Sequence, residues 1–309
     1  MKYKIVFLSR YQDKVHRGAE TFTAELSKRL AKSFSVAIFS DFSFKKINKI
    51  KPDIIIPING GLQALLVKIY CIFTNTKLII SGQAGLGRPD KWNLLLKPDA
   101  FVALTPRNAD WAKKYSFKVN IKTIPNGVDL NTFKPQGKKI KINLSKPIIL
   151  CVAGPEKYKR VEETIKAVAG LKNTSLLLAG GSFQQNKLGK QLLGKRFLNQ
   201  KFTHQQMPAV YRSADVFTLA SDYCEAFAIA YLEALASGLP IVAPDDELRQ
   251  QILGPHALYV KDITDLNQYS QKFKQALEKK AFRPEKWLKQ FSWDNIAQQY
   301  KELCLNLLE

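Results

Sequence analysis

Short apolar runs alternate with amphipathic segments along this chain, and that alternation constrains its fold more than any other feature. In the first half, candidate strands lie at 3–8, 36–39, 54–58, 77–80, 100–104 and 121–124. Between some of them, helical periodicity extends over 21–31, 62–73 and 106–115. Strands that alternate with helices form a parallel sheet covered by helices, so the first half predicts one α/β domain.

A polar, lysine-rich segment at 133–146 carries Pro and Gly and predicts a linker, after which the alternation begins again. Candidate strands follow at 148–153, 175–179, 216–219, 241–243 and 258–260, with helices at 161–171, 207–213 and 266–279. The length of 309 residues exceeds one typical core and fits two domains. We therefore expect domains at 1–140 and 141–291, followed by an amphipathic C-terminal helix at 292–309.

The chain has the features of a cytoplasmic protein. Residues 1–4 lead straight into an apolar run that is only long enough for a strand, so no secretory signal is expected. The most membrane-like run, 62–80, is interrupted by lysines and an asparagine, and we interpret it as a buried helix followed by a strand. Four widely spaced cysteines form no C-x-x-C pair, which argues against a disulfide framework or a zinc site.

The charge is strongly basic: 48 Lys and Arg against 26 Asp and Glu give a formal net charge of +22. A field of this sign favours anionic partners. An anionic membrane surface, a lipid-linked acceptor and a plain surface bias toward lysine all stay open as explanations. The basic runs do not interleave with aromatic residues, so we expect no nucleic acid partner. The expected location is the cytoplasm, including the inner face of the membrane.

The most specific pattern lies between Asp222 and Asp246, where Glu225 and Glu233 stand eight residues apart. Eight helical steps return to within about 80° of the starting face, so one helix would present both carboxylates. The sequence S-G-L-P at 237–240 then predicts a helix stop before a buried strand. Helix N-termini attract phosphate and carboxylates accept hydrogen bonds from sugar hydroxyls, so the segment predicts a ligand platform.

This segment resembles the E-x7-E signature of retaining GT-B glycosyltransferases, in particular the nucleotide-sugar-dependent family 4. Beyond the two glutamates, the matching residues are Phe227, Ala234, Ala236, Gly238 and Pro240. Ala226 and Ala228 replace two glycines whose backbone N–H groups lie close to the donor in that family, and alanine disfavours positive φ. The resemblance covers nearly the whole chain. It implies an α/β GT-B fold, in which two Rossmann-like doubly wound domains face a central cleft.

Two loops resemble family elements that receive the donor diphosphate. In the loop that begins at Gly154, Lys159 matches the family's lysine. Pro155 replaces the family's arginine, and Lys157 and Arg160 are candidate substitutes for it. The loop at 14–22 resembles the family's G-G-x-E turn, with Gly18 at the position of the second glycine. Glycine there would let the backbone approach a phosphate as the next helix begins.

Two further segments resemble family elements on the sugar or acceptor side. I-P-N-G-V-D at 124–129, with Phe133 and Pro135, resembles P-N-G-V-D-x-x-x-F-x-P. Asn-Gly favours a tight turn, and a structural turn and a ligand contact by Asn126 stay equally open. The glycine-rich loop at 81–88 contains Gln83 and Gly85 where many relatives carry a histidine, and it is expected to form a wall of the site.

The resemblance implies a retaining transferase that moves a hexose-type sugar from a UDP- or GDP-sugar to a glycan, lipid-linked or small-molecule acceptor. Glu225 and Lys159 would be catalytic, and Glu233 would accept hydrogen bonds from the ribose. The donor site would also include Gly18, Gly154, Lys157, Arg160, Ala226, Phe227 and Ala228. The chain has no D-x-D motif and its three histidines are far apart, so no metal and no cofactor beyond the nucleotide-sugar are expected.

Other functions fit the sequence less well. An epimerase would need further acid–base residues, and a phosphorylase of this fold would be longer and would use a pyridoxal cofactor. A catalytically degenerate protein that binds nucleotide or anionic lipid is the alternative from another class. Pro155, Ala226 and Ala228 favour that alternative, whereas the intact Glu225 and Lys159 favour an enzyme.

Overall fold

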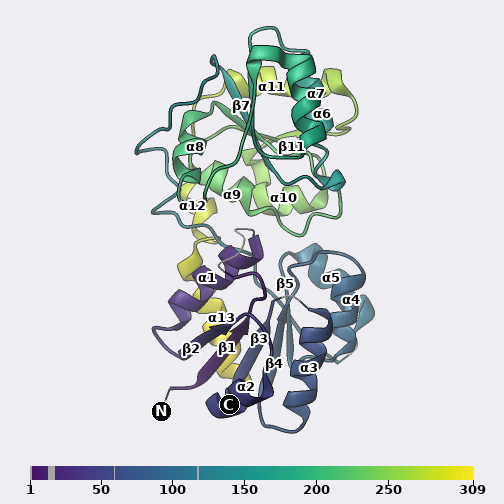
Figure 1. Cartoon of the computed structure of the whole chain (residues 1–309), viewed down its shortest axis with the longest axis vertical. Coiled ribbons are helices and arrows are strands. Elements are labelled where there is room, and N and C mark those ends of the chain that lie inside the picture. The colour runs from purple at the N-terminus through teal and green to yellow at the C-terminus, as the bar shows by residue number, and fades with distance from the viewer. Residues whose placement is uncertain (1, 13–17, 59, 117) are drawn as a thin grey trace. The chain divides into compact units, whose positions relative to one another are not determined.

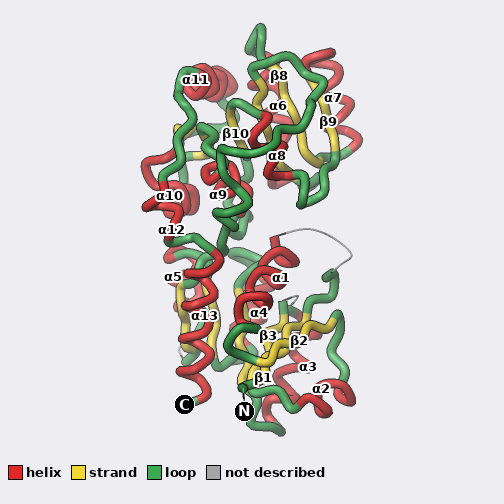
Figure 2. Tube along the Cα trace, turned by 90° about the vertical axis from the view of Figure 1, so that its left-hand side faces the viewer, coloured by secondary structure: helices red, strands yellow, loops and turns green. Residues whose placement is uncertain are grey.

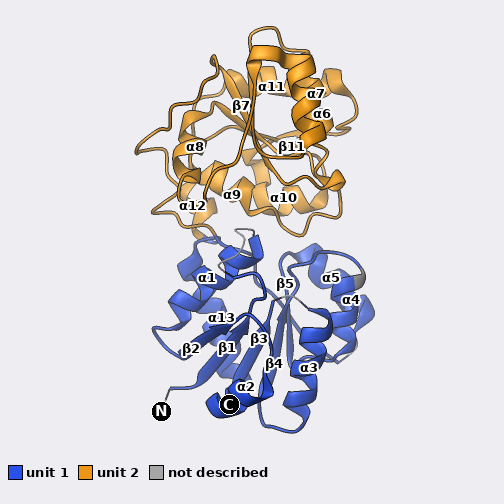
Figure 3. Ribbon diagram, viewed as in Figure 1, with its two compact units in different colours: residues 1–127, 290–309 blue, residues 128–289 orange. Residues whose placement is uncertain are grey.

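The chain forms two compact units, which are coloured separately in Figure 3. The computed structural model describes residues 2–12, 18–58, 60–116 and 118–309. Unit 1 comprises Met1–Gly127 with Gln290–Glu309, and unit 2 comprises Val128–Lys289. The division therefore falls before the boundary expected at 140, and the C-terminal helix belongs to unit 1. Each unit contains a six-stranded sheet with helices packed against it (Figures 1 and 2).

Unit 1 is built on a parallel sheet in the order β2-β1-β3-β4-β5-β6. Its strands are β1 (Lys4–Leu8), β2 (Ser35–Phe39), β3 (Ile54–Pro57), β4 (Lys77–Ser81), β5 (Ala100–Ala103) and β6 (Asn120–Thr123). The β3 sequence is buried along its whole length, as expected for a central strand that helices cover on both faces.

The helices of unit 1 form two layers. One core cluster joins the sheet to α1 (Gly18–Leu30) and α13 (Trp293–Leu308). A second cluster joins the other face of the sheet to α2 (Phe44–Ile50), α3 (Gly61–Ile72), α4 (Arg88–Leu95) and α5 (Pro106–Tyr115). The candidate helix and strand expected within 62–80 therefore form, as α3 and β4.

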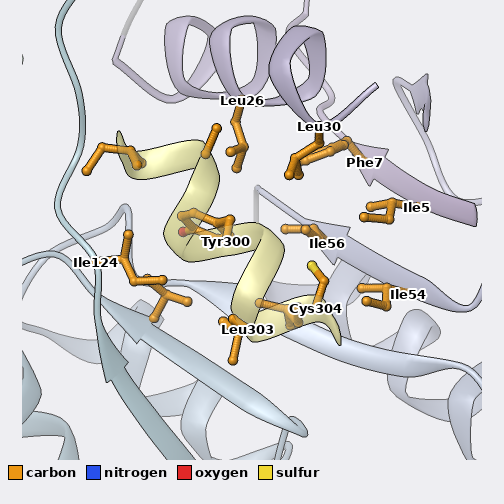
Figure 4. Packing of buried hydrophobic residues seen from close by; sticks show 14 of the residues in the cluster. Ile5, Phe7, Leu26, Leu30, Ile54, Ile56, Ile124, Tyr300, Leu303 and Cys304 are labelled. Atoms are coloured by element: carbon orange, nitrogen blue, oxygen red, sulfur yellow. The ribbon is translucent and has the colours of Figure 1, made fainter. Parts of the chain in front are cut away.

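Helix α13 completes the first of these layers with residues from the far end of the chain. Ser292 caps the helix by accepting a hydrogen bond from the Asn295 N–H. Tyr300 lies among apolar side chains of α1 and the sheet (Figure 4). Its ring meets that of Phe22 at a centroid distance of 5.7 Å. A Cβ added to Gly127 would lie 2.6 Å from the Trp293 ring, so the glycine of N-G serves this close approach rather than a positive φ.

Unit 2 has a parallel sheet in the order β12-β11-β10-β7-β8-β9. Its strands are β7 (Ile148–Ala153), β8 (Ser175–Gly180), β9 (Phe197–Gln200), β10 (Val216–Thr218), β11 (Ile241–Pro244) and β12 (Leu258–Val260). Counted from β7, this is the strand order of the Rossmann fold. The chain direction across the sheet reverses between the neighbouring strands β7 and β10.

Two groups of helices cover this second sheet. Helix α6 (Val161–Ala169) packs against α7 (Phe183–Leu193) and α11 (Leu266–Leu277). Helix α9 (Ile229–Ala236) packs against α8 (Met207–Ser213), α10 (Glu247–Leu253) and α12 (Glu285–Lys289). Short 3-10 turns occur at Lys157–Lys159, Gly194–Arg196 and Gly254–His256.

The polar segment expected as a linker lies on unit 2. It contains no helix or strand from 133 to 147. Ser213 of α8 hydrogen-bonds both the N–H and the carbonyl of Ile140, each at 2.9 Å. Arg212 donates to the Lys138 carbonyl at 2.9 Å. These bonds explain why the segment belongs to unit 2 despite its polar composition.

Candidate functional site

The loops that follow β7 and β10 bring two sequence-predicted residues together. In an open parallel sheet, ligands bind beyond the carboxyl ends of the strands, at the point where the strand order reverses. In unit 2 this point lies between β7 and β10, which are hydrogen-bonded neighbours. The chain after β7 carries Lys159, and the chain after β10 carries Glu225.

Lys159 and Glu225 form a largely buried ion pair. The Lys159 Nζ donates to Glu225 Oε2 at 2.6 Å, and the two side chains are 15% and 8% exposed. Burial disfavours the ammonium, but the charge and hydrogen bond of Glu225 outweigh it and raise the pKa of Lys159. Lys159 is therefore a cation at neutral pH, and it lies in the loop after β7, beside the point where the strand order reverses.

A buried arginine positions the loop that carries Glu225. The Arg249 guanidinium on α10 is fully buried and donates to the Ser221 carbonyl and hydroxyl and to the Asp222 carbonyl. Asp246 caps α10 and accepts from the same guanidinium at 2.8 Å. The Asp222 carbonyl also accepts a hydrogen bond from the Glu225 N–H at 3.2 Å. Hydrogen bonds therefore link Arg249, through the start of the loop, to Glu225.

The second glutamate of the motif is held by a tyrosine that the sequence analysis did not single out. The Tyr211 hydroxyl on α8 donates to Glu233 Oε2 at 2.8 Å, inside the core. Burial first, and then Glu233, raise the pKa of Tyr211 well above its usual value, so it stays a donor. The other carboxylate oxygen of Glu233 lies 3.8 Å from His204 Nε2. Phe133 of the P-N-G-V-D-x-x-x-F-x-P pattern packs on Tyr211 at a centroid distance of 5.8 Å.

The helix between the two glutamates begins later than the sequence predicted. Helix α9 starts at Ile229, so Glu225 precedes the helix and the rotation argument for a shared helical face does not apply to it. The N-cap, Ala228, has φ 62° and ψ 70°, in the left-handed region, whereas Ala226 does not have positive φ. The Phe227 side chain is buried, so only its backbone could contact a donor.

The predicted stop of this helix is present. The Gly238 N–H donates to the Leu235 carbonyl, and the Leu239 N–H donates to the Ala234 carbonyl. These two bonds are those of a Schellman motif, and Gly238 supplies the positive φ of 83° that it needs.

The remaining donor-loop candidates of unit 2 lie close to Lys159 in the chain. Gly154 directly follows β7 and is partly exposed. Lys157 is exposed and opens the 3-10 turn that ends at Lys159. Arg160 has φ 47° and links this turn to the start of α6. The structure thus places these residues in one loop, with Lys159 alone among its three basic side chains held by a hydrogen bond to Glu225.

In unit 1, Gln83 and Asn126 lie together although they are 43 positions apart in the sequence. Their side-chain amides exchange two hydrogen bonds of 3.0 Å. Gln83 also donates to the Ser81 hydroxyl at 2.9 Å, which the Tyr300 hydroxyl contacts at 3.2 Å. The two candidates for the sugar or acceptor side are therefore one network, anchored by the C-terminal helix.

In unit 1, Asp90 is a residue of the candidate site that the sequence analysis did not select. It lies in the first turn of α4, is 2% exposed, and accepts hydrogen bonds from the backbone of Ala84 and Gly85. Burial raises its pKa to about 7 despite these bonds and one from Asn93. Asp90 thus fixes the loop of Gln83 and Gly85, where Gly85 has φ 80°.

The glycine predicted for phosphate binding in unit 1 begins helix α1. Gly18 is exposed at that position. The preceding part of the G-G-x-E-like turn, residues 14–17, lies outside the described residues. Glu20 of the same pattern is buried in the first turn of α1.

A family model described as "Glycosyl transferases group 1" matches residues 133–290. The chain belongs to this family. It is a glycosyltransferase with the GT-B fold, as the two parallel six-stranded sheets indicate. The match covers all of the Lys159, Glu225 and Glu233 geometry in unit 2. No curated protein matches the sequence.

Solved GT-B structures resemble this group 1 glycosyltransferase at low sequence identity. Sucrose-phosphate synthase from Thermosynechococcus elongatus shares 19% identity over 99% of both chains, with a TM-score of 0.82. Anabaena HepE in complex with UDP and glucose shares 16% over 97% of this chain and 99% of HepE, with a TM-score of 0.73. The lipopolysaccharide outer core galactosyltransferase WaaB shares 12% over 99% of both chains, with a TM-score of 0.70. These likenesses confirm the fold expected from the sequence.

Two structural features of the described residues bear on the partners of this glycosyltransferase. Among them, no three His, Cys, Asp or Glu side chains gather in a way that would hold a metal ion. No helix within those residues has the length and apolar character needed to cross a bilayer. Burial and then Asp222 raise the pKa of the Cys224 thiol beside Glu225, which opposes a reactive thiolate there.

Proposed function

We propose that the chain is a retaining, metal-independent transferase of family 4. It moves a hexose-type sugar from a nucleotide-sugar to a glycan, lipid-linked or small-molecule acceptor. The observation that carries this proposal is the buried ion pair of Lys159 and Glu225 at the switch point of unit 2. A phosphate-binding cation and a sugar-binding carboxylate are the two groups that such a reaction needs side by side.

Lys159 would stabilise the leaving diphosphate. As the bond from the anomeric carbon to the phosphate oxygen breaks, its electron pair passes to that oxygen. An ammonium has three N–H donors. Glu225 accepts from one of them and the Tyr158 side chain also interacts with this ammonium, so a remaining donor can turn to the diphosphate. Lys157, Arg160 and the backbone of Gly154 would add positive potential in the same loop. In unit 1, Gly18 would contribute its N–H at the start of α1.

Glu225 would act on the sugar and Glu233 on the ribose. The Glu225 carboxylate would accept hydrogen bonds from the sugar hydroxyls and stabilise positive charge at the anomeric carbon. The acceptor oxygen would then bond to that carbon on the face that the diphosphate leaves, and its proton would pass to the departing phosphate oxygen. Tyr211 occupies one oxygen of Glu233, which supports a role for the other as ribose acceptor. The N–H groups of Ala226–Ala228 and the first turn of α9 would face the diphosphate.

Acceptor recognition would involve unit 1. The side-chain amides of Gln83 and Asn126 are already paired with each other, and Gly85 lies in the same loop as Gln83. Their role would be to hold the shape of an acceptor or sugar site rather than to hydrogen-bond the acceptor through their side-chain amides. HepE binds UDP and UDP-glucose, which supports UDP-glucose as the first donor to test, with GDP-sugars next.

The test compares Lys159→Met with Lys166→Met, which removes an exposed lysine of α6 outside the site. Thermal unfolding with UDP-, GDP-, ADP- and CMP-sugars in EDTA identifies the donor, because a ligand of the native state raises Tm. Transfer or donor hydrolysis is then measured. Loss of one charge-stabilising donor costs roughly 10²–10³-fold in turnover, so Lys159→Met should lose at least about 10²-fold. Lys166→Met should retain wild-type turnover.

The outcomes separate the proposal from its alternatives. Normal turnover by Lys159→Met would refute the role of the ammonium. Donor binding without transfer or hydrolysis by the wild type would identify a degenerate nucleotide-binding protein. Activity that EDTA abolishes would overturn metal independence. Unchanged affinity of Glu233→Ala for every nucleotide would contradict the ribose assignment.

A further inference from the structure

Helix α3 turns its larger apolar side chains away from the sheet. Its buried residues are Gln63, Ala64, Val67 and Tyr70. Its exposed apolar residues, with their exposed fractions, are Leu62 (68%), Leu65 (42%), Ile69 (38%) and Ile72 (66%), followed by Phe73 (82%). The run at 62–73, which the sequence analysis interpreted as buried, is therefore half exposed.

The exposed residues of α3 form one continuous stripe. At 100° per residue, the positions 62, 65, 69, 72 and 73 fall within about 100° of one another. The buried positions 63, 64, 67 and 70 fall within about 120° on the opposite side. A surface helix of a soluble domain places charged and polar residues on this outer face. Helix α3 has only Lys68 as a charged residue, so its outer face is apolar by sequence as well as by structure.

Helix α4, which neighbours α3, adds two exposed apolar side chains. Helices α3 and α4 pack against each other and lie side by side in Figure 1. Lys68 on α3 donates to the carbonyl of Lys97, just beyond α4, at 2.7 Å. On α4, Trp92 is 65% exposed and Leu95 is 55% exposed. We define the α3/α4 apolar surface as Leu62, Leu65, Ile69, Ile72, Phe73, Trp92 and Leu95.

The layer of helices around this surface is strongly basic. Between 44 and 115 the chain has twelve Lys and Arg but only four Asp and no Glu. Helices α2 and α3 contain no acidic residue. Of the four aspartates, Asp90 is buried and Asp110 pairs with Lys113 at 3.1 Å. An apolar stripe bordered by lysines is the pattern of a helix that lies in the interface of an anionic bilayer.

We propose that the α3/α4 apolar surface is a docking site for an anionic lipid bilayer. Its apolar side chains would enter the boundary between headgroups and acyl chains, while the surrounding lysines would contact anionic headgroups. A second copy of the chain would bring two basic surfaces together, which like-charge repulsion disfavours. Aromatic side chains such as Trp92 are favoured at the depth of the headgroups.

This docking site goes beyond the transfer reaction and assigns a definite surface to the anionic membrane that the charge of the sequence left open as a partner. It requires neither nucleotide-sugar binding nor the Lys159–Glu225 pair. The two proposals can therefore fail separately. Lys159→Met, which tests the reaction, is expected to bind vesicles like the wild type.

The experiment measures vesicle binding of the full chain by flotation and by tryptophan fluorescence, without nucleotide. Vesicles contain phosphatidylcholine alone or equal parts phosphatidylcholine and phosphatidylglycerol. Binding is expected only to the anionic vesicles and should weaken as salt rises, because exposed charges are screened. A blue shift and protection from a soluble quencher are expected on binding, and Trp92→Phe should remove both.

A double variant and a matched control decide whether the surface is responsible. Ile72→Ser with Phe73→Ser removes two exposed apolar side chains, and burial of even one of them is worth about 1.5 kcal/mol or more, or at least about tenfold in the partition coefficient. Phe183→Ser removes a comparably exposed phenylalanine of unit 2, 78% exposed, and should change nothing. Thermal unfolding establishes that both variants are folded.

Four results would overturn the proposal. The first is an absence of wild-type binding to either vesicle, and the second is equal binding by the double variant and the wild type. The third is a concentration-dependent dimer in sedimentation that the double variant abolishes, which would assign the surface to a second copy of the chain. Equal loss in Phe183→Ser would likewise refute this surface as the specific site.

Discussion

Replacing Ala228 with glycine should stabilise unit 2, although glycine usually destabilises proteins. Ala228 is the N-cap of α9 and has φ 62°. The left-handed region costs an L-residue roughly 1–2 kcal/mol because Cβ crowds the following carbonyl oxygen. Glycine removes that cost but adds unfolded-state entropy worth roughly 0.4–1 kcal/mol. The difference between these two terms is a stabilisation of roughly 0–1.6 kcal/mol, so the central expectation for Ala228→Gly is about 0.8 kcal/mol.

Ala226→Gly is the matched control. Ala226 is also partly buried and lies in the same loop, but it does not have positive φ. Only the entropy difference applies there, so this variant should destabilise unit 2 by roughly 0.4–1 kcal/mol. The two substitutions make the same chemical change, and they differ only in the backbone conformation that receives it.

Calorimetric or fluorescence melting of the two variants measures the difference. For a domain of 150–250 residues, 1 kcal/mol shifts Tm by roughly 2–4 °C, so the two melting temperatures should differ by several degrees. Urea unfolding provides the free energies directly, provided that m is unchanged. If Ala228→Gly destabilises as much as Ala226→Gly, the left-handed strain at 228 carries no free energy and the reasoning fails. Because the family signature that this segment resembles has glycine at this position, the variant should also keep donor binding.

Two further predictions concern buried charges. Arg249→Met should lower the free energy of unfolding of unit 2 by roughly 3–5 kcal/mol in urea unfolding, because the loop carbonyls lose their donor and Asp246 loses its partner. Arg249→Lys should recover less than half of this lost free energy. Full stability of either variant would contradict the role of Arg249 in positioning the loop before Glu225. Burial raises the pKa of Asp90 in the folded state to about 7 from its ordinary value of 3.8, so the folded state holds the proton between these pH values while the unfolded state releases it. The stability that protonated Asp90 contributes is complete below about pH 4 and is lost as pH rises to about 7. Relative to Asp90→Asn, the free energy of unfolding of the wild type should fall by up to about 4 kcal/mol across this window. If the free energies of unfolding of the two proteins changed in parallel with pH, the raised pKa would be refuted.

The sequence predicts the strongly periodic elements of this fold well. The helix at 106–115 and the strand at 148–153 have the expected bounds, because apolar periodicity and clear caps agree there. Sequence periodicity does not predict helices α2, α4, α7, α10 and α12, because they are short or mainly polar and their stability comes from packing. Helix α7 did have a local signal, since Ser182 and Gln185 form a capping box at its start.

The candidate site was predictable only where a family pattern links distant residues. Lys159 and Glu225 are 66 positions apart, and no periodicity connects them, yet both belong to loops with recognisable motifs. Tyr211 and Arg249 have no such motif. Each sits on a short helix of ordinary sequence, and only the tertiary structure shows that one fixes Glu233 and the other fixes the loop before Glu225. Residues that position a site need only the right place in the core, so sequence spacing gives them little signal.

The burial of Lys159 is central to how the site would use it. An exposed ammonium is well solvated, and its attraction to a phosphate is weakened by water and salt. The Lys159 side chain is instead only 15% exposed, and Glu225 compensates the cost of its desolvation and keeps the ammonium charged. Its charge is thus in place before a diphosphate arrives, and little reorganisation is needed when the leaving group becomes negative. This preorganisation is the physical reason to expect a large loss in Lys159→Met and a smaller one in the exposed Lys157.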